Sequence, residues 1–191
     1  MDLRVQKTKR AIIAAFLALL KEKDFSDISI IDITSNAQIA RPTFYLHYKH
    51  KEEVLTEYLD DMFAQYLEDI RPELEVDNRA IPSSALFNQV KKNADYLRAL
   101  LDNNTATIIQ NKLHTYVQEV MRMIMALQLF KGSSRLTEAQ CHYITTALAG
   151  MTFSVILRWM EGGMAESPQE MGEFLNRMIR SGVVDILQFG L

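Results

Sequence analysis

Cysteine, glycine and proline are scarce in this sequence, and each shortage excludes a class of protein. A single cysteine among 191 residues, Cys141, allows no disulfide and no paired-cysteine metal site within one chain, and it fits a reducing, cytoplasmic setting. No glycine precedes Gly132, so the first part of the chain has no glycine-rich loop for phosphates. The motifs GxSxG and HExxH are also missing. These absences argue against an enzyme, and no cofactor is expected.

The most apolar run near the start of the chain is too short to cross a membrane. The run AIIAAFLALL at 11–20 follows the basic segment KTKR at 7–10, an order that secretory signals share. KEKD comes next in place of a small-residue cleavage site, and a bilayer span needs about 20 apolar residues. The largest side chains repeat at helical spacing. The pattern therefore favours a buried amphipathic helix, with a secretory signal as the alternative.

Charge is unevenly distributed, although the net formal charge is only −3. Residues 1–51 contain nine Lys or Arg and five Asp or Glu, whereas residues 52–191 contain twelve and nineteen. A basic N-terminal part on an acidic remainder favours contact between that part and a polyanion. Because the excess is small, it supports such a function only together with a motif.

Helical spacing dominates the pattern, and no segment alternates apolar and polar residues cleanly enough to predict a strand. We expect helices over about 8–23, 30–36, 41–47, 50–71, 85–101 (one helix or two), 104–129, 136–161 and 168–188. Pro72 is expected to end the fourth of these, and the polar segment 72–84 is the candidate linker. The predicted fold class is all-α.

The connection before the last helix carries the clearest local signals. Gly162 or Gly163 suits the residue just after a helix, where a left-handed conformation is common. Ser167 suits an N-cap, Pro168 the first turn, and Glu170 the reciprocal partner of a capping box. A sharp helix–helix joint is therefore predicted here.

Residues 40–54, ARPTFYLHYKHKEEV, interleave aromatic and basic side chains directly after the short helix predicted at 30–36. Two short helices joined by about four residues form a helix-turn-helix candidate. In the second helix, Phe44 and Tyr48 lie four apart and are expected in the core. Arg41, Thr43 and Tyr45 then project elsewhere, as an element that enters the major groove of DNA requires.

These outward side chains have the chemistry of DNA contacts. Arginine can bind guanine with two hydrogen bonds, and a threonine methyl can touch a thymine methyl. The Tyr45 hydroxyl and the Lys51 ammonium group can bind phosphates. Lys51 also stands at the start of the next helix, where free backbone N–H groups attract phosphate as well. His47 is either structural or a phosphate contact. His47 and His50 have no acidic or cysteine partner that would complete a metal site, so no metal is expected.

The segment 25–55 resembles the TetR family of bacterial transcriptional regulators. The matching positions are Ser29, Ile33, Ala37, Ile39, Thr43, Tyr45, His47, Tyr48, Lys51 and Val54 or Leu55. The resemblance implies a DNA-binding role for Ser29, Arg41, Pro42, Thr43, Tyr45, His47 and Lys51. It covers about 50 residues well, and elsewhere it extends to the helical layout and to ILRWMEGGMAESPQEM, typical of the family's dimer region.

Three positions depart from the family pattern. Gln38 stands where glycine is usual, and a positive φ there would cost roughly 1 kcal/mol. Ala40 replaces a serine that would supply a cap or a phosphate contact, and Thr34 replaces the usual alanine. These departures weaken the motif without breaking it, and they keep open a module that has lost DNA binding.

The resemblance also implies a homodimer and a small-molecule effector bound by the acidic remainder of the chain. We expect a helix-turn-helix DNA-binding domain over 1–50 and a ligand-sensing and dimerisation domain over 51–191. Apolar stripes in the last two predicted helices suggest a dimer interface, or alternatively the chain's own core: Met151, Val155, Trp159, Leu175, Met178, Gly182 and Ile186. The candidate ligand-binding residues are Phe63, Tyr66, Phe87, Tyr96, His114, Met121, Met125 and His142.

The leading hypothesis is thus a homodimeric transcriptional regulator that binds a palindromic double-stranded DNA operator and responds to an unknown small molecule. A repressor is expected, although an activator would use the same DNA-binding residues. The alternative is a helical ligand-binding or protein-interaction module that no longer binds DNA.

Overall fold

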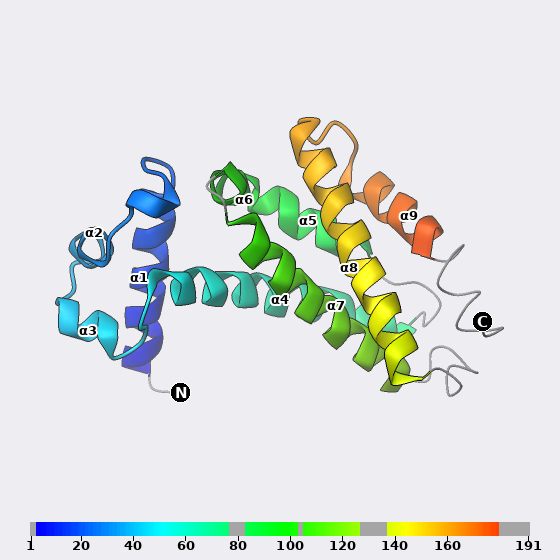
Figure 1. The fold of residues 1–191 in the computed structure, drawn as a ribbon, viewed down its shortest axis with the longest axis horizontal. Coiled ribbons are helices and arrows are strands. Elements are labelled where there is room, and N and C mark those ends of the chain that lie inside the picture. The colour runs from blue at the N-terminus through cyan, green and yellow to red at the C-terminus, as the bar shows by residue number, and fades with distance from the viewer. Residues whose placement is uncertain (1–2, 77–82, 103–104, 127–136, 180–191) are drawn as a thin grey trace. The chain divides into compact units, whose positions relative to one another are not determined.

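A computed structural model describes residues 3–76, 83–102, 105–126 and 137–179. These residues form nine α-helices and one short 3-10 helix, and no strand occurs among them (Figure 1). The helices are α1 (Leu3–Leu19), η1 (Phe25–Asp27), α2 (Ile30–Asn36), α3 (Arg41–Tyr45), α4 (Lys51–Val76), α5 (Ser83–Lys92), α6 (Ala94–Asp102), α7 (Ala106–Ala126), α8 (Glu138–Glu161) and α9 (Pro168–Ile179). The predicted all-α class is confirmed.

The chain divides into two compact units. The first contains residues 1–62 and 93–109, so it includes α1 to α3, the start of α4 and all of α6. The second contains residues 63–92 and 110–191, which include the rest of α4, α5, all but the first turn of α7, α8 and α9. Helix α4 thus contributes to both units, and α6 belongs to the unit that holds the helix-turn-helix.

The first unit is built around the apolar run at 11–20. Ile12, Phe16 and Leu20 are at most 3% exposed, which confirms the predicted buried helix. Phe16 meets Phe25 of η1 edge to face, with ring centroids 6.0 Å apart. Ile33 of α2 is fully buried as well. In the part of the chain that the structure describes, no helix combines the length and apolar character that a membrane crossing requires.

The second unit depends on close packing between α5 and α9. Gly172 of α9 is buried, and a Cβ added to it would lie 2.6 Å from the Cα of Ser84. Beside this contact, the Ser83 hydroxyl donates a hydrogen bond of 2.7 Å to the side-chain oxygen of Asn176. Phe87 of α5 is fully buried and meets Trp159 of α8 edge to face, at 5.2 Å between centroids.

The joint between α8 and α9 has the predicted capping. Gly163 adopts φ 77°, followed by Met164 at φ 56°. The Ser167 amide donates to Glu170 Oε2 over 2.8 Å, and the Glu170 amide donates to Ser167 Oγ over 3.2 Å. These reciprocal bonds confirm the capping box read from the sequence.

Three predicted helix boundaries are wrong, including the end of α1 at Leu19 in place of residue 23, and residues 85–101 form parts of two helices. Helix α1 begins at Leu3, five residues before the expected start. Pro72 does not end α4, which continues to Val76. A proline removes one backbone donor from a helix, and here the exposed side of α4 carries both Pro72 and Glu68, the residue whose carbonyl loses its partner. Water can satisfy that carbonyl, so the helix continues and the expected linker is shorter.

Candidate nucleic-acid interface

Helix α2 begins at a complete capping box. The Ser29 hydroxyl accepts a hydrogen bond from the Asp32 amide at 3.1 Å, while the Ser29 amide donates to Asp32 Oδ2 at 2.9 Å. Lys23 adds an ion pair to Asp32 at 3.0 Å. These bonds, those from Ser29 above all, lower the pKa of Asp32 to about 2. Ser29 therefore has a structural role at the start of α2, and its side chain lies at an exposed position.

The turn after α2 uses a left-handed residue. Gln38 has φ 54°, so this position does require the conformation that favours glycine. The Ile39 amide donates to the Thr34 carbonyl at 3.0 Å and the Gln38 amide to the Ser35 carbonyl at 3.2 Å. This pair of bonds is a Schellman motif, and it directs the chain into α3.

The inner face of α3 is anchored by aromatic packing. Phe44 is fully buried and Tyr48 is 3% exposed, which confirms that both belong to the core. Their ring centroids lie 5.6 Å apart. Burial and the nearby Glu57 raise the pKa of the Tyr48 hydroxyl above its usual range. Lys9 of α1 lies over the Tyr48 ring and forms an ion pair with Glu57 at 2.7 Å, which ties α1 to α4.

The outer face of α3 presents the side chains expected to touch DNA. Arg41 and Pro42 are exposed, Thr43 is half-buried, and Tyr45 is 47% exposed. Arg41 Nη2 donates to Tyr45 Oη over 3.2 Å, so these two side chains form a pair on the surface. Leu46, which the sequence reasoning did not single out, is 80% exposed at the end of the helix.

Lys51 makes internal hydrogen bonds that the sequence did not reveal. Its ammonium group donates to the backbone carbonyls of Phe25, Ser26 and Ile28, the last two at 3.0 and 2.9 Å. All three N–H bonds of the group are therefore used within the protein. Lys51 thus fastens the loop before α2 to the first turn of α4. His47 is half-buried beside Tyr48, with ring centroids 6.5 Å apart.

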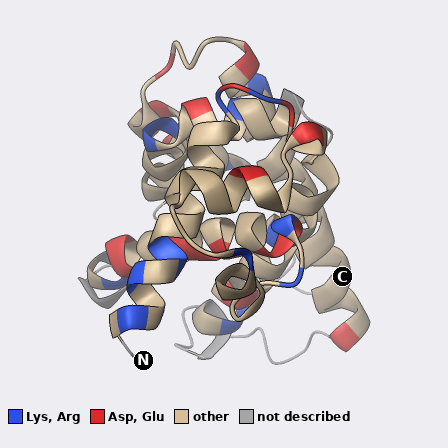
Figure 2. Cartoon of the chain, turned by 90° about the vertical axis from the view of Figure 1, so that its left-hand side faces the viewer, with Lys and Arg blue, Asp and Glu red and all other residues tan. Residues whose placement is uncertain are grey.

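Basic side chains also follow α1. Figure 2 shows them as successive blue bands along the helix that begins near the N-terminus. Among them, Lys7 and Arg10 are exposed and Lys9 forms an ion pair with Glu57.

Among the described residues, no group of three or more His, Cys, Asp or Glu side chains could hold a metal ion.

The candidate ligand-binding residues do not gather at one place. Tyr66, Phe87 and Met121 are buried in the second unit. Phe63 stacks on Tyr116 with ring centroids 4.1 Å apart. Tyr96 belongs to the first unit instead, where the ammonium nitrogen of Lys21, in the turn after α1, lies 4.7 Å from its ring centroid.

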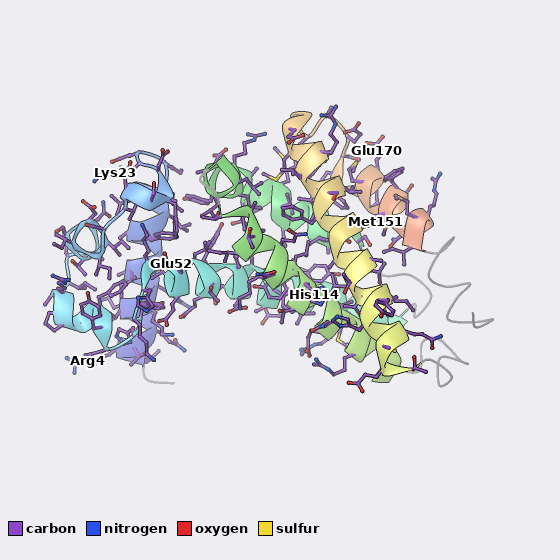
Figure 3. The ribbon with its side chains drawn as sticks, in the orientation of Figure 1. Arg4, Lys23, Glu52, His114, Met151 and Glu170 are labelled. Carbon is purple, nitrogen blue, oxygen red and sulfur yellow. The ribbon has the colours of Figure 1, made fainter. Side chains whose placement is uncertain are left out.

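Two histidines of this set do meet in the second unit: His114 of α7, which is labelled in Figure 3, and His142 of α8. His114 and His142 lie edge to face, with centroids 5.8 Å apart. The side-chain amide of Gln118 hydrogen-bonds the His114 ring at 3.1 Å. His142 itself is exposed, and the side chain of Met125 lies outside the described residues.

The candidate dimer residues divide between core and surface. Trp159 and Leu175 are 3% and 2% exposed, so the chain itself buries them. Met151 and Val155 are half-buried, and Met178 is 39% exposed. Gly182 and Ile186 lie outside the described residues. Phe174, at 51% exposure, was missed although it stands four residues before Met178 on the same face of α9.

Two family models match the chain. One, described as the C-terminal region of transcriptional regulators, matches residues 83–181, and one, described as bacterial regulatory proteins of the tetR family, matches residues 12–58. The chain is 27% identical over 181 residues to the uncharacterized HTH-type transcriptional regulator YxbF of Bacillus subtilis. That alignment covers 91% of this chain and 45% of the relative, so the chain spans less than half of that relative's length.

Solved structures share the fold. A TetR transcriptional regulator from Streptococcus agalactiae aligns with a TM-score of 0.63 and 22% identity, covering 93% of this chain and 96% of the other. Thermus thermophilus FadR, a TetR family repressor in complex with lauroyl-CoA, aligns with a TM-score of 0.59 and 20% identity, covering 92% and 94%. At these identities the likeness concerns the fold alone.

Proposed function

Because the chain belongs to the TetR family of bacterial transcriptional regulators, which bind DNA, we propose that it is a homodimeric repressor of a palindromic operator. The observation that carries this is the two-sided α3. Its inner side is fixed in the core by Phe44, and its outer side exposes Arg41 and Tyr45 beside the half-buried Thr43. A short helix with one anchored face and one polar face is suited to reading base edges in a major groove.

The remaining contacts divide by role. Arg41, Pro42 and Thr43 face the bases, and His47 lies toward the phosphates that border the groove. Ser29 and Lys51 act from behind: Ser29 caps α2, and Lys51 holds the loop of residues 25–28 that leads into it. The orientation of α2 and α3 on DNA therefore depends on both, even though their polar groups bond within the protein.

A dimer supplies the second reading helix, because a single short α3 buries too little surface for useful specificity. We propose that α8 and α9 form its interface. Exposed or half-buried apolar residues on these helices support this: Met151, Val155, Phe174 and Met178. Trp159 and Leu175 stabilise the helices from inside.

Control by a small molecule is proposed for the second unit, where aromatic and methionine side chains are concentrated. The lauroyl-CoA bound by FadR supports a ligand with an apolar acyl chain in a protein of this fold. A ligand releases DNA if it binds the released form more tightly than the DNA-bound form. Helix α6 is placed to respond, since Tyr96 contacts Lys21 in the turn after α1 and Tyr58 of α4 within the first unit.

Selection of bound sequences from a library of random DNA duplexes, followed by titration with the selected operator, tests the function. We expect affinity to fall steeply with salt, because phosphate contacts release counterions. Arg41→Ala should weaken binding by about 1 to 3 kcal/mol for each half-site. Arg71→Ala, which removes an exposed arginine from the body of the chain, should bind as the wild type does.

The alternative module without DNA binding makes the opposite prediction. In that case no duplex is enriched, and the non-specific affinity of Arg41→Ala equals that of the wild type. The departures at Gln38 and Ala40 favour this alternative, whereas the intact turn around Gln38 favours a working helix-turn-helix.

A further inference from the structure

The ring of Tyr45 links the surface of α3 to its buried core. Phe44 is fully buried, and the Tyr45 ring meets it edge to face with centroids 5.7 Å apart and an interplanar angle of 88°. Aromatic pairs of this geometry are favourable beyond the area they bury, so the contact restrains the Tyr45 ring. Tyr45 is nevertheless 47% exposed, so one side of the ring is fixed and the other remains open.

Arg41 rests on that open side through two different contacts. Its guanidinium donates a hydrogen bond of 3.2 Å to the Tyr45 hydroxyl, and its Cζ lies 5.6 Å from the ring centroid. The two residues are four apart on α3, the spacing that brings side chains together on a helix. Among the described residues Arg41 has no ion-pair partner, so its charge is not neutralised by a neighbouring carboxylate.

An arginine side chain that is already restrained binds a base more favourably than one that is free to rotate. An arginine side chain has many rotamers, and part of this conformational entropy is lost whenever it binds. A partner that restrains it beforehand reduces the loss on binding. The guanidinium has five N–H donors and spends one on Tyr45, which leaves the pair needed for O6 and N7 of guanine.

We propose that Tyr45 is a positioning residue that holds the Arg41 guanidinium for a guanine in each operator half-site. This rests on the proposed function, because it requires that α3 enters the major groove. It replaces the simpler expectation that the Tyr45 hydroxyl holds a phosphate. Discrimination for one guanine then depends on Tyr45, although Tyr45 itself touches no base.

The test uses two operators. The first is the operator that the wild type selects; in the second, adenine replaces the guanine whose preference is lost in Arg41→Ala. Affinities for both are measured for the wild type, Tyr45→Phe, Tyr45→Leu, Arg41→Ala and the double variant Arg41→Ala/Tyr45→Leu. Tyr45→Phe keeps the ring and removes the oxygen, whereas Tyr45→Leu removes both contacts with Arg41. Tyr143→Leu changes another exposed tyrosine, on α8, and serves as the matched control.

We expect the wild type to prefer guanine by about 10- to 100-fold. Tyr45→Phe should keep part of this preference, and Tyr45→Leu should lose most of it. In Arg41→Ala, adding Tyr45→Leu should have little further effect, because the residues act as a unit. The dependence of affinity on salt should stay the same in all Tyr45 variants, since no phosphate contact is lost.

Two outcomes would overturn the proposal while leaving DNA binding intact. In the first, Tyr45→Leu loses affinity equally for both operators, its effect adds to that of Arg41→Ala in the double variant, and affinity depends less steeply on salt. Tyr45 would then be a phosphate contact. In the second, Arg41→Ala leaves the preference for every guanine of the operator unchanged. If the wild type selects no duplex, the proposed function fails and this inference fails with it.

Discussion

The aromatic clusters of the two units place their side chains very differently. In the first unit, Phe44 and Tyr48 are buried and the adjoining Tyr45 extends the cluster to the surface, where it meets Arg41. In the second unit, Phe63 lies between Tyr66 and Tyr116. Tyr66 is 6% exposed. One cluster thus supports a charged surface and the other stabilises packing between helices.

This difference follows from the distances along the chain over which each cluster is assembled. Residues 41–48 are neighbours on one helix and its adjoining turn, so local spacing decides which side chains are inside. Phe63 and Tyr116 are separated by more than 50 residues and meet only because α4 and α7 pack together. A surface for reading DNA can be local, whereas a ligand cavity or dimer interface requires several helices to be placed.

The largest effect should come from the exposed face of α9, whose proposed role as a dimer interface would distinguish the second unit from the first most clearly. Phe174→Asp would place an unpaired carboxylate in that interface, at a cost of about 3 to 5 kcal/mol. We expect sedimentation velocity to show a shift from dimer toward monomer. Leu46→Asp introduces the same carboxylate at the exposed residue that directly follows α3 and should remain dimeric. An unchanged dimer in Phe174→Asp would exclude this face of α9.

Lys51 tests whether the first unit is as firmly held as its contacts indicate. Lys51→Met removes three hydrogen bonds that a charged group makes to carbonyls 23 to 26 residues away in the sequence. The free energy of unfolding should fall by about 1.5 to 3 kcal/mol. Urea unfolding measures this, with Lys49→Met, an exposed neighbour, as the control. At temperatures where the variant is folded, the slope of log affinity against log salt should stay constant. A slope reduced by about one for each Lys51 lost would show phosphate contact instead.

These cases show how far sequence reasoning reaches. The capping box at Ser167 and Glu170 and the buried Phe44 were predictable, because each depends on residues three or four apart. The carbonyl partners of Lys51 were not, since no side-chain pattern identifies a backbone acceptor in a distant loop. Periodicity marked Trp159 as an apolar-face residue without telling whether its own chain or a partner covers it.

The continuation of α4 past Pro72 is another limit of local rules. The sequence rule assigns proline a fixed cost in a helix, of about 3 kcal/mol. That cost depends on where the freed carbonyl lies, and Glu68 and Pro72 both stand on the exposed side. Burial of Tyr66 and Ile70 stabilises the same helix from its other side. The balance between these effects requires the packed structure.

Within the second unit, the close packing of α5 on α9 should tolerate an added side chain less well than the open side of α8. Gly172→Ala brings a Cβ against the backbone of Ser84, and overpacking of this kind costs about 1 to 3 kcal/mol. Thermal unfolding should show the loss. Gly150→Ala, on α8, has no atom within 4 Å of its new Cβ and should gain up to about 1 kcal/mol from helix propensity. A loss in Gly150→Ala would place a second chain against α8.

The smallest effects come from two helix ends, one in each unit, that use a positive φ with different residues. Gln38 at φ 54° carries a Cβ that this conformation disfavours, whereas Gly163 at φ 77° does not. Gln38→Gly should therefore raise the free energy of unfolding by up to about 1 kcal/mol, the strain relieved being partly offset by the greater freedom of glycine in the unfolded chain. Gly163→Ala should lower it by up to about the same amount, through backbone strain and not a clash, since its added Cβ has open space; the reduced freedom of the unfolded chain offsets part of this loss. Urea titration of both variants measures whether the free energy of unfolding rises in Gln38→Gly and falls in Gly163→Ala. If Gln38→Gly proved less stable and also bound the selected operator more weakly, the glutamine side chain would have a role in the turn or at the DNA that outweighs its backbone strain.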